Sequence, residues 1–395
     1  MASATAGIGP NDVLLVFLPD RTAPDADWIT RIEGTYPGLK VRLVSQADPS
    51  TGQVRDVNSL PAEVWDGVTL LVSHWPPRTT DTKVFSYAVQ TTIKPKTTLP
   101  NLRFVQVPSA GADRWIGHET FQRPGVTIAT GNGTHAPQIA EWVIGTWLMA
   151  RHHFLQFAAY MPTGNSWEHR FDYMGEDSTN TRIGILGYGA IGRQVAKLAA
   201  AFGMEVYAYT RSERSTPESR ADPDTYCVPG TGDPDGLLPS KWFHGTETDD
   251  INKFLSQNLD LLVVATPLTA STTKLLGSDQ FAVLDQSRTG NLRNGKPKPK
   301  TYVINIARGK VIDTDAILHA LHNYQISGAA LDVTDPEPLP ADHALWKAPN
   351  VFIAPHVSWQ SNHMRERLLG VLELNLERLH AGKPLVNVLH KELKY

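Results

Sequence analysis

One glycine-rich turn constrains the fold of this chain more than any other feature. Gly187, Gly189 and Gly192 follow a short apolar run at 181–186 and precede a helical pattern at 193–200. In a strand–turn–helix unit, Gly187 would permit the tight turn, Gly189 would let a pyrophosphate approach the backbone, and Gly192 would let helix and strand pack closely. The helix N-terminus would offer free N–H groups to the phosphates. The turn therefore predicts a dinucleotide site, and the alternative is a turn that serves packing alone.

Short apolar runs separated by helical-length gaps recur along the whole chain. They lie at residues 13–18, 41–44, 68–72, 103–107, 181–186, 205–209, 261–265, 302–306, 326–331 and 351–354. Alternating strands and helices are typical of parallel sheets covered by helices. A helix over about 137–160 would lead into the second sheet, and one over about 361–381 would return to the first domain. We predict an α/β fold with two doubly wound parallel-sheet domains, residues 1–135 plus 358–395 and residues 136–357.

Composition and charge exclude several classes of protein. A net charge of −3 gives no broad attraction to nucleic acid or anionic membranes. No apolar run approaches the length of about 18 residues that a membrane span needs, and residues 1–5 do not resemble a secretory signal. The single cysteine, Cys227, excludes an internal disulfide and a cysteine-based zinc site. We expect a cytoplasmic protein with no metal site and no nucleic-acid or membrane partner.

Two stretches interrupt the alternation of strands and helices. Residues 212–245 are rich in Pro, Gly, Ser and Asp, and residues 287–300 are basic without an acid. The basic residues are Arg288, Arg293, Lys296, Lys298 and Lys300. Both stretches are interpreted as surface insertions away from the chemistry. The basic one is interpreted as a solvated loop, with contact to an anionic partner as the alternative.

The end of the second strand in the dinucleotide unit indicates which cofactor binds. An NAD site usually has a carboxylate there for the ribose 2′-hydroxyl. Here the strand ends in Thr210, Arg211 and Ser212, and the first acid is Glu213. An arginine and two hydroxyls suit a 2′-phosphate, which an acid would repel. We predict NADP(H) preference with NAD(H) possible; the alternative is that Arg211 is solvated or stacks on adenine without discriminating.

Three ionisable residues lie at or just beyond predicted strand ends in the second domain: Arg308, Glu337 and His356. Ligands of open α/β sheets bind at the carboxyl ends of the strands. His356 could donate a proton to a developing alkoxide, Glu337 could orient the imidazole and favour its charged form, and Arg308 could clamp a substrate carboxylate. Singly, each could be an ordinary surface residue, whereas together they predict 2-oxo acid reduction.

The sequence resembles the D-isomer-specific 2-hydroxyacid dehydrogenases, which include glyoxylate/hydroxypyruvate reductases, from about Val105 to Val388. The matching segments are residues 109–113, 140–141, 184–192, 266–269, 305–309, 331–340, 355–356 and 382–388. The resemblance implies a Rossmann cofactor domain inserted in a flavodoxin-like substrate domain, and a homodimer formed through the cofactor domains.

The resemblance also implies roles for individual residues. Arg308, Glu337 and His356 would be the catalytic trio, and Asp332 would hold the nicotinamide carboxamide. Backbone N–H groups near Ala110 and Gly111 would bind the substrate carboxylate. Other positions would contact the cofactor: Ala190 and Ile191 the pyrophosphate, and Thr266, Pro267, Thr272 and Ala307 the rest of the cleft.

Substrate choice and one competing function stay open. Trp75 and Trp359 could favour a larger apolar 2-oxo acid, or could instead pack within the domain or the dimer interface. The missing acid at 210–212 departs from the NAD-using pattern of the family. The same fold also serves nucleotide-sensing corepressors that bind partner peptides, and turnover of any 2-oxo acid would separate the two functions.

Overall fold

The protein is described by a computed structural model that covers residues 7–47, 55–77, 99–291, 295 and 297–391. The sequence interpretations of residues 1–5, Arg293 and Lys296 lie outside this part of the chain. Two compact units result. Unit 1 contains residues 1–134, 224–226 and 361–395, and unit 2 contains residues 135–223 and 227–360. Residues 224–226 belong to unit 1, although the residues on both sides of them belong to unit 2. The predicted domain boundaries did not assign this short piece to the first domain.

Unit 1 is built on a parallel sheet of five strands in the order β2-β1-β3-β4-β5, the flavodoxin-like arrangement. Its strands are β1 (Val13–Leu18), β2 (Lys40–Ser45), β3 (Val68–Ser73), β4 (Phe104–Gln106) and β5 (Thr127–Ala129). Its helices are α1 (Ala26–Thr35), η1 (Val57–Ser59), η2 (Ala62–Trp65), α2 (Asp113–Ile116), α3 (Glu119–Gln122) and α11 (Met364–His380). Leucines from both ends of the chain share one core, Leu14 from β1 and Leu372 from α11 among them.

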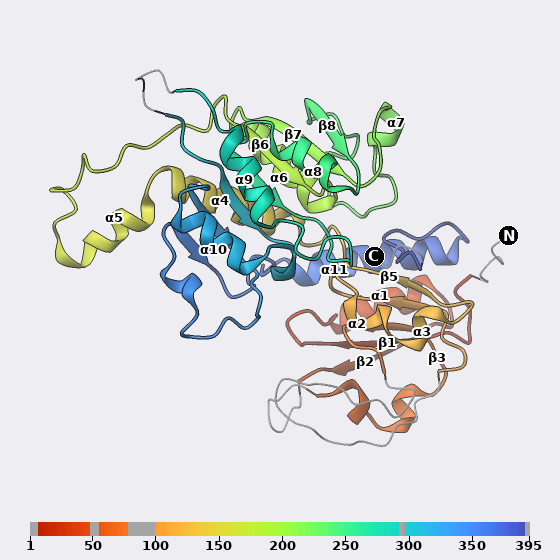
Figure 1. Cartoon of the computed structure of the whole chain (residues 1–395). Coiled ribbons are helices and arrows are strands. Elements are labelled where there is room, and N and C mark those ends of the chain that lie inside the picture. The colour runs from red at the N-terminus through yellow and green to blue at the C-terminus, as the bar shows by residue number, and fades with distance from the viewer. Residues whose placement is uncertain (1–6, 48–54, 78–98, 292–294, 296, 392–395) are drawn as a thin grey trace. The chain divides into compact units, whose positions relative to one another are not determined.

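Unit 2 is built on a parallel sheet of seven strands in the order β12-β11-β10-β9-β6-β7-β8. Figure 1 labels three of them, β6, β7 and β8. The strands are β6 (Arg182–Leu186), β7 (Glu205–Thr210), β8 (Lys241–His244), β9 (Leu261–Val264), β10 (Tyr302–Asn305), β11 (Gly328–Leu331) and β12 (Val351–Ile353). The helices are α4 (Ala136–Arg151), α5 (Phe154–Tyr160), η3 (Met161–Thr163), α6 (Ala190–Ala201), α7 (Pro217–Arg220), α8 (Thr248–Leu255), α9 (Ser278–Ser287), η4 (Gly309–Val311), α10 (Thr314–His322) and η5 (Ala344–Lys347). The strand order reverses between β6 and β9, and ligands of such sheets bind at this crevice. The predicted α/β class with two parallel sheets is confirmed.

Three local predictions were wrong or incomplete. The single helix expected over 137–160 is broken, because His153 has φ 57° and separates α4 from α5. Strands β5 and β8 were not predicted. β8 lies inside the stretch interpreted as a surface insertion and pairs in parallel with β7.

Membrane and metal sites were sought in the described part of the chain. There, no helix combines the length and apolarity needed to cross a bilayer. In the same residues, His, Cys, Asp and Glu side chains form no group of three or more that could hold a metal ion.

Candidate active site

The glycine-rich turn joins β6 to α6, and each glycine has its own geometric reason. Gly187 has φ +106°, a conformation that side chains disfavour, and a Cβ there would lie 2.7 Å from the carbonyl of Ala265. A Cβ at Gly192 would collide with the carbonyl oxygen of Gly187. A Cβ at Gly189 would meet nothing within 4 Å, so the space in front of this residue is open. Gly189 is also the N-cap of α6 and has no side chain to occupy the free N–H groups of Ala190 and Ile191. This open helix start fits a dinucleotide pyrophosphate.

Residues 210–212, at the end of β7, carry one positive and no negative charge. Arg211 and Ser212 are exposed, and Thr210 is half-buried. The Thr210 hydroxyl donates to the Ser212 carbonyl oxygen at 2.8 Å, so it holds this turn closed. The accessible cation next to the glycine-rich turn is therefore the Arg211 guanidinium.

The loop after β9 forms a second wall at the carboxyl edge of the sheet. Thr272 donates its hydroxyl proton to the Pro267 carbonyl oxygen at 2.7 Å and accepts from the Thr269 N–H at 2.7 Å. Thr266 is half-buried beside the Gly187 turn. Thr272 therefore orders the 266–272 turn through contacts within the loop.

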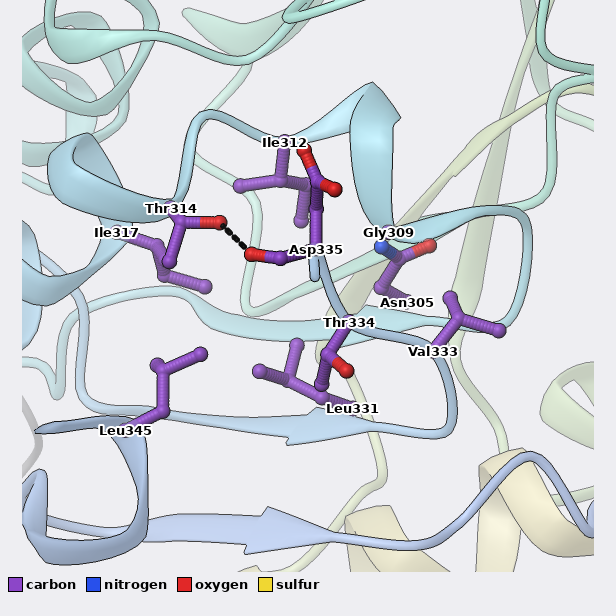
Figure 2. A pocket seen from close by; sticks show the side chains of 10 residues that line it. All are labelled: Asn305, Gly309, Ile312, Thr314, Ile317, Leu331, Val333, Thr334, Asp335 and Leu345. Carbon is purple, nitrogen blue, oxygen red and sulfur yellow. Dashed lines mark hydrogen bonds between the residues drawn. The ribbon is translucent and has the colours of Figure 1, made fainter. Parts of the chain in front are cut away.

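The loops after β10 and β11 interlock around a small pocket (Figure 2). Asn305 is buried, accepts the Ala307 N–H at 3.0 Å and donates to the Arg308 carbonyl oxygen at 3.1 Å. A Cβ at Gly309 would overlap the carbonyl of Thr334, so only glycine permits this approach. Figure 2 also shows the Thr314 hydroxyl bound to the Asp335 carbonyl oxygen at 2.7 Å. The backbone that carries Arg308 is thus fixed against the loop that carries Glu337.

His356 and Glu337 form a hydrogen-bonded pair. The Nδ1 atom of His356 lies 2.7 Å from Oε1 of Glu337, and their side chains are 40% and 39% exposed. His356 has φ 55°, a left-handed conformation that is rare for a residue with a side chain. Such conformations cost roughly 1–3 kcal/mol and collect at functional sites. The pair is therefore accessible to solvent, and its histidine has an uncommon backbone conformation.

Asp332 holds the backbone that carries His356. Its carboxylate is buried and accepts hydrogen bonds from the N–H groups of Val357 and Ser358 at 2.8 and 3.1 Å and from the Ser358 hydroxyl at 2.5 Å. The His356 N–H donates to the Asp332 carbonyl oxygen at 2.8 Å. Sequence reasoning missed this role of Asp332 and the part played by Ser358. Arg308, Glu337 and His356 follow the neighbouring strands β10, β11 and β12 at one edge of the sheet.

The expected substrate residues Ala110 and Gly111 lie in unit 1, in the turn after β4. The Ser109 hydroxyl donates to the Gly111 carbonyl oxygen at 2.7 Å, and the Gly131 N–H donates to the Ser109 carbonyl oxygen at 2.9 Å. In both bonds the acceptor is a carbonyl oxygen of the turn, and together the two bonds order the turn.

The two tryptophans considered for substrate choice have different surroundings. Trp75 follows β3 and is 37% exposed, and the Arg114 guanidinium carbon lies 3.4 Å from its ring centroid. Trp75 therefore presents a cation-covered ring, which does not favour the large apolar acid considered from the sequence. In unit 2, Trp359 Nε1 donates to the His356 carbonyl oxygen at 2.8 Å, and Gln138 Nε2 donates to the Trp359 carbonyl oxygen at 2.7 Å.

The insertion at 212–245 contacts the cofactor turn directly. The Tyr188 hydroxyl, from within the glycine-rich turn, donates to the Asp233 carboxylate at 2.7 Å. The insertion therefore packs on the cofactor turn, and its expected distance from the catalytic residues stays a prediction. A proline- and glycine-rich composition signals a loop but does not say where the loop packs.

Comparisons with known proteins identify the same regions. The sequence profile described as "D-isomer specific 2-hydroxyacid dehydrogenase, NAD binding domain" matches residues 144–227 and 238–358, more than half of the chain. A protein of Corynebacterium melassecola, described as uncharacterized and encoded in the proB 3′ region, is 30% identical over 72% of this chain and 81% of its own length. A glycerate dehydrogenase of Methylorubrum extorquens is 29% identical over 72% of this chain and 78% of its own length.

A solved structure shows the same fold over nearly the whole chain. It is an NADPH-dependent glyoxylate/hydroxypyruvate reductase from Sinorhizobium meliloti, in complex with NADP and sulfate. The TM-score is 0.63 at 24% identity, and the match covers 97% of this chain and 100% of that one.

Proposed function

Because the chain belongs to the D-isomer specific 2-hydroxyacid dehydrogenase family, we propose that it reduces a 2-oxo acid to its D-2-hydroxy acid with a nicotinamide dinucleotide. The observation that carries this proposal is the His356–Glu337 pair, 2.7 Å apart at the edge of the sheet that bears the glycine-rich turn. The pair supplies a proton donor, and the turn supplies a place for the cofactor. The same residues serve the reverse oxidation.

His356 is the proton donor in this mechanism. A nicotinamide dinucleotide held at the glycine-rich turn would supply the hydride for the reduction. Glu337 accepts a hydrogen bond from Nδ1–H of His356, so the proton that passes to the developing alkoxide oxygen comes from Nε2 of the imidazolium, and the ring is left as the neutral Nδ1–H tautomer. Asp332 keeps the His356 loop in place through Val357 and Ser358.

Arg308 binds the substrate carboxylate and polarises the carbonyl. Its planar donor fork matches a carboxylate better than an ammonium would. Asn305 and Gly309 fix the backbone on either side of it. For Ala110 and Gly111, in unit 1, the proposed role is still to bind a substrate carboxylate through their backbone N–H groups. The substrates we propose are short, polar 2-oxo acids such as glyoxylate and hydroxypyruvate, in line with the activities named for the Methylorubrum and Sinorhizobium proteins.

A panel of 2-oxo acids, monitored by oxidation of NADPH and of NADH, tests this function. We expect turnover of glyoxylate or hydroxypyruvate above that of branched apolar 2-oxo acids. No turnover of any acid would instead favour the corepressor alternative, which no comparison supports.

Substitution of the proton donor tests the mechanism. We expect His356→Asn to lower kcat by roughly 10²–10⁴-fold, the usual contribution of general acid–base catalysis. NADPH affinity, measured by fluorescence titration, should stay unchanged because the substitution leaves the glycine-rich turn intact. His343→Asn is the matched control, since His343 caps η5 and accepts the Leu345 N–H. Activity of the His356 variant close to that of the unmodified protein would refute its role.

NADPH is proposed as the preferred cofactor. Arg211 is exposed at the end of the second strand of the dinucleotide unit, and residues 210–212 carry no acid, which supports binding of a 2′-phosphate. The Sinorhizobium protein, whose fold this chain shares, is described as NADPH-dependent. We place the protein in the cytoplasm, where its one cysteine, the exposed Cys227, would stay reduced.

The partner we propose is a second copy of this chain, bound through an arm formed by residues 153–178. The arm includes α5, which has no buried residue, and it extends away from the sheet of unit 2 (Figure 1). Large apolar side chains are exposed along it: Phe154, Leu155, Met161, Trp167, Phe171 and Met174. Contacts within the arm, such as the stacked Tyr160 and His169 rings 3.8 Å apart, give it a defined form. An ordered apolar surface of this kind is typical of a protein interface.

A further inference from the structure

The insertion contains a closed loop that packs on the cofactor turn. We call residues 222–238 the insertion loop; the Asp222 N–H donates to the Pro234 carbonyl oxygen at 2.9 Å and closes it. The family profile matches residues on both sides but passes over 228–237. The part of the loop that contacts the turn is therefore an addition to the common family domain.

Asp233 is the centre of this contact. The residue is only 6% exposed, and its carboxylate accepts the Tyr188 hydroxyl at 2.7 Å together with the N–H groups of Leu237 at 2.9 Å and Leu238 at 3.2 Å. Burial and the bond to Asp233 raise the pKa of Tyr188 far above its usual range. The Tyr188 hydroxyl therefore keeps its proton and donates it to Asp233.

The loop also binds the first turn of α6. Arg193 Nη1 donates to the Asp233 carbonyl oxygen at 2.5 Å, and the Gly232 N–H donates to Gln194 Oε1 at 2.6 Å. Arg193 is 5% exposed, and its guanidinium carbon lies 5.1 Å from the centroid of the Tyr188 ring. One loop thus holds a residue within the glycine-rich turn and two residues of the helix that follows it.

Such an anchor matters because glycine is the most flexible residue. Tyr188 stands between Gly187 and Gly189, and it is the residue of this triplet that has a side chain. The free N–H groups at the start of α6 bind a pyrophosphate well only if they already point toward it. If the turn became ordered only when the cofactor bound, the entropy cost of that ordering would lower the affinity for the cofactor.

We propose that Asp233 is a positioning residue for the cofactor: acting through Tyr188 and Arg193, it holds the glycine-rich turn in the form that receives the pyrophosphate. This inference rests on the proposed use of a nicotinamide cofactor and adds a residue from outside the common family domain. Asp233 does not touch the substrate, so its effect falls on cofactor binding.

Tyr188→Phe tests the proposal because it removes the hydroxyl and leaves the backbone bonds of Asp233. We expect the Kd for NADPH, measured by fluorescence titration, to rise about 5- to 10-fold, as for the loss of one typical intramolecular hydrogen bond. KM for NADPH should rise in parallel, while kcat at saturating NADPH and KM for the 2-oxo acid stay unchanged. Asp233→Asn should raise the Kd for NADPH by a similar factor. In the double variant, the loss of binding free energy should be smaller than the sum of the losses in the two single variants.

Tyr302→Phe is the matched control. Tyr302 is 6% exposed against 4% for Tyr188, belongs to the same unit and begins β10. The Tyr302→Phe substitution should leave the Kd for NADPH unchanged, and its only expected effect is a lower melting temperature. A Tyr188→Phe protein whose Kd stays within about twofold of the unmodified value, well under the effect of one hydrogen bond, would overturn the positioning role alone. An unmodified protein that binds neither NADPH nor NADH would overturn the proposed function as well.

Discussion

Arg211 stands exposed at the end of β7, where the ribose of a bound dinucleotide is read. We expect Arg211→Ala to raise KM for NADPH by about tenfold, because a charge-assisted bond to the 2′-phosphate would be lost. KM for NADH should change little, since NADH has no phosphate there. Steady-state kinetics with both cofactors measure the effect.

Lys253→Ala, which removes an exposed cation from α8 in the same unit, is the control for net charge. Equal losses with NADPH and NADH in the Arg211 variant would argue that this side chain stacks on adenine without discriminating.

Single residues differ in how far the sequence could predict their surroundings. The geometry of Gly187 and Gly192 could be predicted because it depends on backbone only a few residues away. The Tyr188–Asp233 bond spans 45 positions and begins in a loop of low hydrophobicity, so no periodicity points to it. The resemblance to the family assigned Asp332 the role of binding the nicotinamide. Its hydrogen bonds to residues 357 and 358 depend on a fold that only the structure shows.

At the level of elements, one carboxylate joins the starts of three strands in unit 1. Asp12, just before β1, accepts hydrogen bonds from Thr69 of β3 at 2.6 Å and from Arg103, which precedes β4, at 2.7 Å. Burial would raise the pKa of Asp12, but the bonds from Arg103, Thr69 and Gly9 outweigh it and lower the pKa. The Asp12 carboxylate therefore stabilises the fold fully at pH values above the pKa of an aspartate in the unfolded chain. This stabilisation is lost as the pH falls through the lower pKa that Asp12 has in the folded protein.

We expect Asp12→Asn to lower the free energy of unfolding at neutral pH by about 2 kcal/mol, as for hydrogen bonds to a charged group. Urea unfolding at neutral and acidic pH measures this. The gap between the variant and the unmodified protein should narrow as the pH falls below about 4, where carboxylates protonate. Asp66→Asn, at an exposed aspartate of the same unit, serves as a control for charge alone, and a gap independent of pH would contradict the assignment.

The strands of both sheets could be predicted because buried parallel strands are continuous apolar runs. The elements that were missed lack this signal. β8 reads Lys-Trp-Phe-His, with charged or polar ends, because it lies at the edge of its sheet. The break between α4 and α5 falls at His152 and His153, where neither glycine nor proline announces it.

For the molecule as a whole, the arm predicts the assembly state. Trp167 and Phe171 are 79% and 75% exposed. Replacing both with Glu should convert a dimer to a monomer, because charge in a buried apolar interface is costly. Sedimentation velocity measures the change. Leu237→Glu, at a side chain 76% exposed outside the arm, should leave the dimer intact. An unmodified protein that sediments as a monomer would refute the interface.

The core of unit 1 has a consequence for the order in which the protein can mature on the ribosome. Residues 1–134 emerge first, yet Leu368, Leu372 and Leu376 of their shared core belong to α11 and emerge only after unit 2. Domains generally fold as units during synthesis, starting from the N-terminus. Here the unit begun first is completed last, so the nascent first sheet must wait with apolar surface uncovered while the cofactor unit folds. A chain that stops just before residue 364 would therefore lack the core helix α11 of unit 1, although the missing residues follow unit 2 in the sequence.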